Sequence, residues 1–304
     1  GFARGHRWPY RRSVAVPPSS APASGAPIGA AGIVLLGLAL QEVGASIAVL
    51  LFPQTGAAGM VTLRLVLSAA VLLIVCRPRL RGHAGSAWIT VIGFGMALAA
   101  MNLLFYEALV RLPLGAAVTI EVIGPLVLSV VVGRRAIGWR WAGLALVGVV
   151  LLGRGGLTEL DPIGVLFAAG AGTMWAAYIL LSARTSRAFA KLDGLAIAMT
   201  VGALLVLPFG VATAGPVLVQ PNILGLGLAV ALLSSTIPYA LELRALRTLP
   251  PAAFSILMSL APATAATAGF LILGQELGVL QLVAVGLVVV ASAGAVLSNP
   301  RPGG

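Results

Sequence analysis

The sequence predicts an all-α membrane protein whose ten transmembrane helices form two inverted five-helix repeats. Three observations underlie this prediction. The chain is 60% hydrophobic and 9% charged, whereas soluble domains contain about 25% charged residues. Ten apolar segments follow one another, most of them near the length of about 20 residues that a helix needs to cross a bilayer. One stretch of the first half also returns, in altered form, 137 positions later.

The repeat relates residues 102–125 to residues 239–262, with two prolines and two leucines coinciding at the shared offset. Each copy is an apolar run that ends in an Arg-containing break with Leu-Pro. A second apolar run follows and is interrupted twelve residues later by another proline. Because proline removes a backbone hydrogen bond from a helix, each copy is predicted to be a helical hairpin. Its second helix is expected to be kinked or broken at Pro125 in one copy and at Pro262 in the other.

A polar, basic segment precedes the apolar ones. Residues 1–28 are rich in Pro, Ser and Ala and include four arginines, so we expect a disordered cytoplasmic tail. The predicted helices are 30–52, 60–76, 87–109, 114–133, 140–153, 163–182, 194–214, 222–243, 251–273 and 279–298. The gaps between them are short, which favours antiparallel neighbours.

The basic residues indicate the topology. If the N-terminus is cytoplasmic, 16 of the 19 Lys and Arg residues fall on the cytoplasmic side, as the positive-inside rule requires. Both termini are then cytoplasmic, and the net charge of +11 reflects topology rather than nucleic-acid binding. The remaining three, Arg64, Arg111 and Arg154, fall at outer ends. We interpreted Arg64 as an arginine that snorkels from the outer start of the second helix.

The position of the two copies gives the repeat a mechanical meaning. They lie five helices apart, and five is odd, so the second copy is upside down relative to the first. Residues 30–153 and 163–298 are therefore predicted to be inverted halves, related by a pseudo-two-fold axis in the membrane plane. This arrangement is typical of secondary transporters, which alternate between outward and inward states of similar energy.

Several stretches resemble a known family over about residues 30–298. They are GASIAVLLFPQTGAAGMVTLRL from Gly44, NLLFYEALVRLPLGAAVTIEVIGPL from Asn102, GAGTMWAAYIL from Gly170, SSTIPYALELRALRTLPPAAFSILMSLAPATAA from Ser234 and LGQEL from Leu273. In these residues the chain resembles the EamA-type drug/metabolite transporter superfamily. Two positions depart from the pattern: Glu42 is not a residue of it, and Gln275 replaces a usual Gly.

The resemblance implies a ten-helix carrier with EamA-type repeats in the bacterial cytoplasmic (inner, plasma) membrane. It would export small amino acids, threonine or homoserine first, or related metabolites, by proton antiport. Its partners would be the small-molecule substrate, protons and the lipid bilayer, without nucleic acid, cofactor or metal. Export of another metabolite or drug is the alternative.

Three acidic residues, Glu42, Glu121 and Glu242, lie well inside apolar segments. A charged carboxylate at the bilayer centre costs about 2.5–3.5 kcal/mol on insertion scales, so such a group is usually in a cavity, paired or protonated. All three are candidates for proton coupling. Glu121 is the strongest, because it lies four residues before Pro125, where a kink frees backbone groups to line a cavity. A structural hydrogen bond at Glu121, or an interfacial ion pair between Glu242 and Arg244, is the alternative.

Polar and aromatic side chains on four of the segments are candidates for substrate binding, although any one of them is more often a helix-packing residue. They are Asn102, Tyr106, Thr119, Trp175, Tyr178, Thr236 and Tyr239. The sequence contains no H-E-x-x-H, G-x-S-x-G or G-x-x-x-x-G-K-[ST] motif, which argues against an enzyme or an ATP-driven pump. A channel would favour a ring of like charges, and no such ring is visible.

Overall fold

The computed structural model describes residues 26–133, 136–154, 160–190, 192–245, 254 and 257–298. Every regular element in these ranges is a helix. In chain order they are α1 (Ala26–Cys76), α2 (Gly85–Leu109), α3 (Leu114–Glu121), α4 (Ile123–Gly133), α5 (Ala136–Arg154), α6 (Pro162–Ala188), α7 (Asp193–Ala214), the 3₁₀-helix η1 (Gly215–Val219), α8 (Pro221–Ala231), the π-helix η2 (Leu232–Thr236), α9 (Ile237–Ala245), α11 (Ala261–Leu273) and α12 (Val279–Ser298). The predicted tail lies outside the described residues, apart from 26–28.

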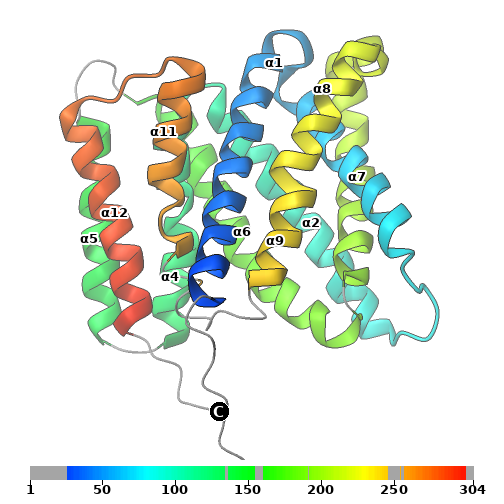
Figure 1. The fold of residues 1–304 in the computed structure, drawn as a ribbon, viewed down its shortest axis with the longest axis horizontal. Helices are drawn as coiled ribbons and strands as arrows, with labels where there is room; N and C mark the ends of the chain where they lie inside the picture. The colour runs from blue at the N-terminus through cyan, green and yellow to red at the C-terminus, as the bar shows by residue number, and fades with distance from the viewer. Residues whose placement is uncertain are drawn as a thin grey trace, which may run out of the picture.

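Seven helical segments are long and apolar enough to cross a membrane, and two shorter apolar helices accompany them at Ile137–Leu152 and Ala261–Leu273. This confirms an all-α membrane protein. The first two predicted helices follow each other without a loop within α1, which consists of two helices joined at a non-helical residue, Gly56. It turns back at Gly56, where φ is 65°, a conformation that glycine adopts without steric cost. In Figure 1 its dark blue part rises and its light blue part descends.

The fourth predicted helix, 114–133, is divided in two. α3 ends at Glu121, Val122 is a turn and α4 begins at Ile123. The interruption lies just before Pro125 because a proline cannot donate to the carbonyl four residues earlier and its ring clashes with that carbonyl. For Pro125 this carbonyl belongs to Glu121. The same order recurs near Pro262, which is the second residue of α11 and follows a turn at residues 259–260.

The eighth predicted helix, 222–243, contains a second irregularity. Its middle turn is the π-helix η2, which separates α8 from α9. A π-turn accommodates an extra residue within a helix and changes the direction in which backbone carbonyls and side chains point. Ala231 lies immediately before it, and its carbonyl accepts hydrogen bonds from the Thr236 and Ser68 hydroxyls at 3.4 and 3.3 Å.

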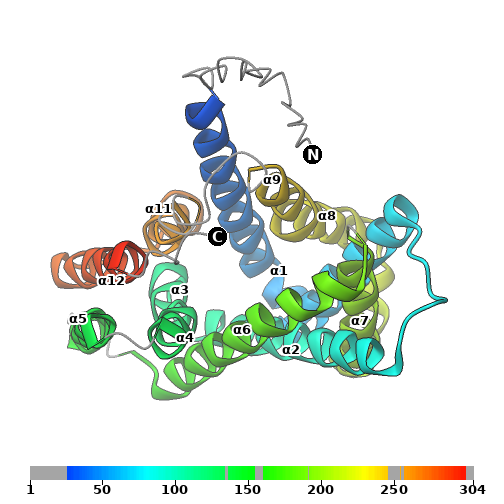
Figure 2. The ribbon, with the colours of Figure 1, turned by 90° about the horizontal axis from the view of Figure 1, so that it is seen from below.

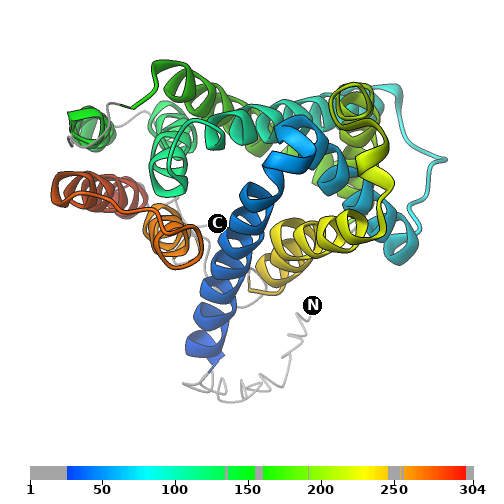
Figure 3. The same cartoon turned by 90° about the horizontal axis from the view of Figure 1, so that it is seen from above.

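The helices pack through small residues. Gly95 of α2 lies so close to α7 that an added Cβ would be 2.6 Å from the Ala198 carbonyl oxygen. Gly124 of α4 and Gly172 of α6 bring two backbones together in the same way. Such contacts are the usual basis of helix association in lipid. The views along the vertical axis of Figure 1 show α5 and α12 side by side at one end of the molecule and the first part of α1 between α11 and α9 (Figures 2 and 3).

Candidate functional site

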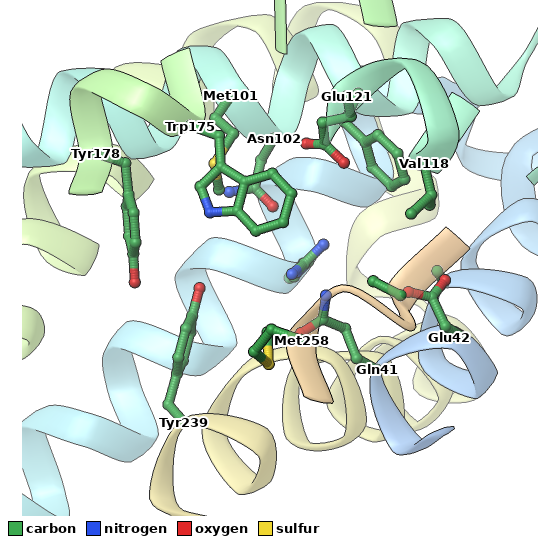
Figure 4. A pocket seen from close by; sticks show the side chains of 14 residues that line it. Gln41, Glu42, Met101, Asn102, Val118, Glu121, Trp175, Tyr178, Tyr239 and Met258 are labelled. Carbon is green, nitrogen blue, oxygen red and sulfur yellow. The ribbon is translucent and has the colours of Figure 1, made fainter. Parts of the chain in front are cut away.

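A cavity of about 110 Å³ lies among α1, α2, α3, α6, α9 and α11. It is found beside the interruption between α3 and α4, so the broken helix forms part of its wall. Six of the ten residues predicted for proton coupling or substrate binding line it: Glu42, Asn102, Glu121, Trp175, Tyr178 and Tyr239. Figure 4 shows Glu121 and Glu42 on different helices, and the hydroxyl groups of Tyr178 and Tyr239 pointing toward one another.

Arg64 also lines the cavity, and the expectation that it snorkels to the outer surface is wrong. Its side chain is only 7% exposed and lies eight residues beyond the turn at Gly56, about 12 Å along the helix. The Nε group donates to the Ser235 hydroxyl at 3.0 Å, Nη1 to the Tyr106 hydroxyl at 3.2 Å and Nη2 to the Ser234 carbonyl at 3.1 Å. The guanidinium carbon is 5.5 Å from the centre of the Tyr106 ring.

The π-helix η2 explains how Arg64 is held. Two of the three acceptors are the Ser234 carbonyl and the Ser235 hydroxyl, both within η2. Pro238 has no N–H group to donate to the Ser234 carbonyl four residues earlier, which leaves this carbonyl available for the guanidinium. Such π-turns are frequent at functional sites. From α1, Gly44 packs against the same turn, where an added Cβ would meet the Ser234 hydroxyl. Arg64 is therefore held against η2 by hydrogen bonds, beside the close contact between Gly44 and the same turn.

The carboxyl groups of Glu42 and Glu121 are buried, with 2% and 8% exposure. Ion pairs within 4.0 Å among the described residues join Arg111 to Glu107 and to Asp161, and none involves either cavity carboxylate or Arg64. The cavity thus holds a guanidinium and two carboxyl groups without direct pairing between them in the described part of the chain. These groups are free to interact with a small molecule.

Three of the described predicted residues, Tyr106, Thr119 and Thr236, do not line the cavity. Tyr106 is fully buried behind it and accepts the hydrogen bond from Arg64. The Thr119 hydroxyl donates to the Gly115 carbonyl at 2.6 Å, and that of Thr236 to Ala231 within its own helix. Glu242 belongs to α9, but its side chain lies outside the described residues, so its role stays a prediction.

The cavity contains both members of three pairs related by the 137-residue offset. They are Gln41 with Tyr178, Asn102 with Tyr239, and Glu121 with Met258. Glu121 and Met258 also stand at equivalent places, each four residues before the proline near its helix interruption. Residues that lie 137 positions apart in the chain therefore share one cavity.

Apolar helices around a cavity with buried charges define an integral membrane transport protein rather than an enzyme. Comparison with known proteins agrees, since residues 162–297 match the EamA-like transporter family. The threonine/homoserine exporter RhtA of Escherichia coli strain K12 is 38% identical over 268 residues, which cover 88% of this chain and 90% of that protein. RhtA of Salmonella typhimurium strain LT2 is 36% identical over 271 residues, covering 88% and 92%.

The chain therefore belongs to the EamA-like transporter family. One solved crystal structure also superposes on it with a TM-score of 0.60, covering 90% of this chain and 99% of that one. At 19% identity, that likeness shows the fold alone.

Proposed function

We propose that the protein is a secondary active exporter of a small zwitterionic amino acid, threonine or homoserine first, driven by exchange for protons. The observation that carries the proposal is the cavity lined by Arg64, Glu42 and Glu121. A zwitterion needs a cationic partner for its carboxylate and an anionic partner for its ammonium group. Both kinds of partner are present, and the related exporters are named for threonine and homoserine.

The size of the cavity agrees with a substrate of this class. One water molecule needs roughly 10–15 Å³ of such volume, so about 110 Å³ has room for on the order of ten non-hydrogen atoms. Threonine and homoserine fall within that limit. The aromatic rings of Trp175, Tyr178 and Tyr239 supply an apolar wall for the carbon skeleton.

Ten membrane crossings in two inverted halves, 30–153 and 163–298, form the scaffold of this proposal. The apolar run Gly29–Cys76 has 48 residues and would measure about 72 Å if straight, more than twice the hydrocarbon thickness of about 30 Å. Its turn at Gly56 makes it two crossings. One pair of contacts is also equivalent: α2 packs on α6, and its counterpart α9 packs on the first part of α1, where Gly37 lies against Pro238 and Leu241.

We place both termini in the cytoplasm of a bacterial cell. The start of α1 and the end of α12 lie at the lower edge in Figure 1, the same edge as the exposed loop that contains Arg77, Arg79 and Arg81. Positive charge favours the cytoplasmic side. A reporter fused at Gly156 is expected to read as external and one at Gly304 as cytoplasmic; the reverse result at either position would refute the topology.

Glu121 is our candidate for the group that couples proton entry to export. It is buried, lines the cavity and lies at the interruption between α3 and α4, where a change in its charge acts on a bend in the helix. A proton arriving from outside would neutralise the carboxylate, and substrate would bind again once the proton has left to the cytoplasm. Coupling requires that proton and substrate favour different conformations of the carrier.

The test is threonine efflux from loaded membrane vesicles, with and without an inward proton gradient. Glu121→Gln removes the titrating group but keeps the shape of the side chain. This variant should lose stimulation by the gradient and keep exchange of labelled for unlabelled threonine. Glu107→Gln is the matched control, because Glu107 is a partly exposed glutamate at the outer end of α2 that pairs with Arg111.

Gradient stimulation of Glu121→Gln at the level of the parent would show that Glu121 is not the coupling group, and Glu242 and Glu42 would be tested next. If the parent moves neither threonine nor homoserine, the substrate assignment fails. Saturation of efflux and counterflow in the same vesicles separate a carrier from a channel, which shows neither.

A further inference from the structure

Among the described residues, the groups that accept hydrogen bonds from the Arg64 guanidinium are all neutral. The Tyr106 and Ser235 hydroxyls and the Ser234 carbonyl accept three of its hydrogen bonds. A guanidinium has five N–H donors, so two have no acceptor among the described residues. No carboxylate lies within 4.0 Å of the group in the described part of the chain. The buried charge is thus oriented without a direct ion pair in the described part of the chain.

An unneutralised buried cation is costly unless something of opposite charge completes it. A ligand in the cavity can be this partner, because Arg64 lines the cavity together with Glu42, Glu121 and Trp175. The planar fork of a guanidinium matches the two oxygens of a carboxylate, with which it forms parallel charge-assisted hydrogen bonds. A ligand carboxylate in the cavity would supply both the charge and the missing acceptors.

We propose that Arg64 binds the carboxylate group of the transported molecule, and that η2 positions Arg64 for this purpose. The protein would then select ligands by their carboxylate and reject otherwise similar molecules that lack it. The inference rests on the proposed function in placing the substrate in this cavity, but it applies to any amino acid that the protein transports.

Ser235 and Tyr106 are positioning residues in this arrangement, since each holds Arg64 by a single hydrogen bond and neither needs to touch the ligand. Removing one of these bonds keeps the charge in the cavity but loosens its orientation. Ser235→Ala and Tyr106→Phe should therefore raise the KM for the carboxylate ligand about three- to tenfold, in keeping with a single hydrogen bond to a charged group, with little change in kcat. A purely structural role would lower the amount of folded protein instead.

The experiment compares threonine with threoninol, in which an alcohol replaces the carboxylate, and with threonine amide. Each competes with labelled threonine for efflux from vesicles that contain the parent or a variant. The parent should bind threonine about ten- to a hundredfold more tightly than either analogue. Arg64→Gln should reduce this ratio to within threefold. Arg64→Lys, which keeps the charge without the fork, should fall between. Arg111→Gln, at the outer surface, is the matched control and should keep the ratio of the parent.

A parent-like ratio in Arg64→Gln would overturn the inference. If both Arg64 variants fail to fold, Ser235→Ala decides: a raised KM with a reduced ratio supports the inference, and unchanged values of both refute it. The same competition with all twenty amino acids separates this inference from the proposed function. Arg64-dependent preference for another amino acid, without threonine transport, would refute only the substrate assignment. Proton-driven threonine export with no Arg64-dependent preference would refute only the role of Arg64.

Discussion

The two halves of the chain contribute unlike chemistry to one cavity. The first half supplies Glu42, Arg64 and Glu121, which are charged or ionisable. The residues 137 positions later are Ile179, Val201 and Met258, all apolar. On the second half the cavity wall is instead aromatic, through Trp175, Tyr178 and Tyr239.

This difference separates two requirements of a carrier. Two halves with a similar backbone arrangement let a carrier adopt two states of similar energy. A binding site must distinguish the polar end of an amino acid from its carbon skeleton, which requires different side chains in the two halves. The comparison predicts that changes in the first half alter charge recognition and coupling, whereas changes in the second half alter the choice of carbon skeleton.

The largest effect is expected where the two helix interruptions differ in packing. Gly124 lies against the backbone of Gly172 with no room for a Cβ, whereas the equivalent residue in the second half is Ala261, a buried alanine. Gly124→Ala should therefore lower the free energy of unfolding by about 3 kcal/mol, the upper part of the range for overpacking. Ala261→Gly should cost about 1 kcal/mol. Reversible unfolding in detergent measures both.

Gly143→Ala provides the control for this pair, because a Cβ at Gly143 would meet no atom within 4 Å. It should leave the free energy of unfolding unchanged or raise it. Equal losses for Gly124→Ala and Gly143→Ala would mean that the contact between α4 and α6 is not the cause.

An intermediate effect is expected from the aromatic wall. Trp175→Ala enlarges the part of the cavity that faces the carbon skeleton, and a change of a methylene or more in an apolar pocket is worth about tenfold or more in discrimination. The ratio of phenylalanine efflux to threonine efflux should rise about tenfold. Trp139→Ala, at an exposed position of α5, should leave the ratio unchanged. A ratio in Trp175→Ala equal to that of the parent would show that the Trp175 indole does not determine which substrate is preferred.

The smallest effects are expected from Thr119 and Thr236. Their hydroxyls donate to backbone carbonyls of neighbouring residues rather than lining the cavity. Thr119→Val and Thr236→Val should change the rate of threonine efflux by no more than about twofold, because valine has the same shape and each lost hydrogen bond is local. A tenfold fall in the rate of threonine efflux for either variant would contradict this placement and show that the threonine contributes to the site.

Much of the site was predictable because ionisable groups are rare and costly within a bilayer. That argument located Glu42 and Glu121 from their apolar surroundings, and aromatic residues near them followed. It missed Arg64 because the second helix was expected to begin at residue 60, which put Arg64 near an end. The helix instead starts from the turn at Gly56, so Arg64 lies about two turns inside it.

The sequence predicted that helices would be interrupted near Pro125 and Pro262, but it did not predict the residue at which each interruption falls. A proline disturbs the carbonyl four residues before it, so the interruption precedes Pro125 and follows Glu121 rather than falling on the proline. The π-helix η2 has a comparable signal in Pro238, which cannot donate to the Ser234 carbonyl four residues earlier. Proline alone does not specify a π-turn, so the form of this irregularity was not predictable from Pro238.

The turn within α1 has a consequence for how the chain enters the membrane during synthesis. It consists of little more than Pro53 to Gly56, so the far end of this hairpin carries no charged group across the bilayer. Translocating a charged loop is a cost that this segment avoids, and its two arms bury their backbone hydrogen bonds within themselves. In the topology that we propose, the two arms of α1 are therefore suited to insert together as one hairpin, which brings Glu42 and Arg64 into the membrane in a single step.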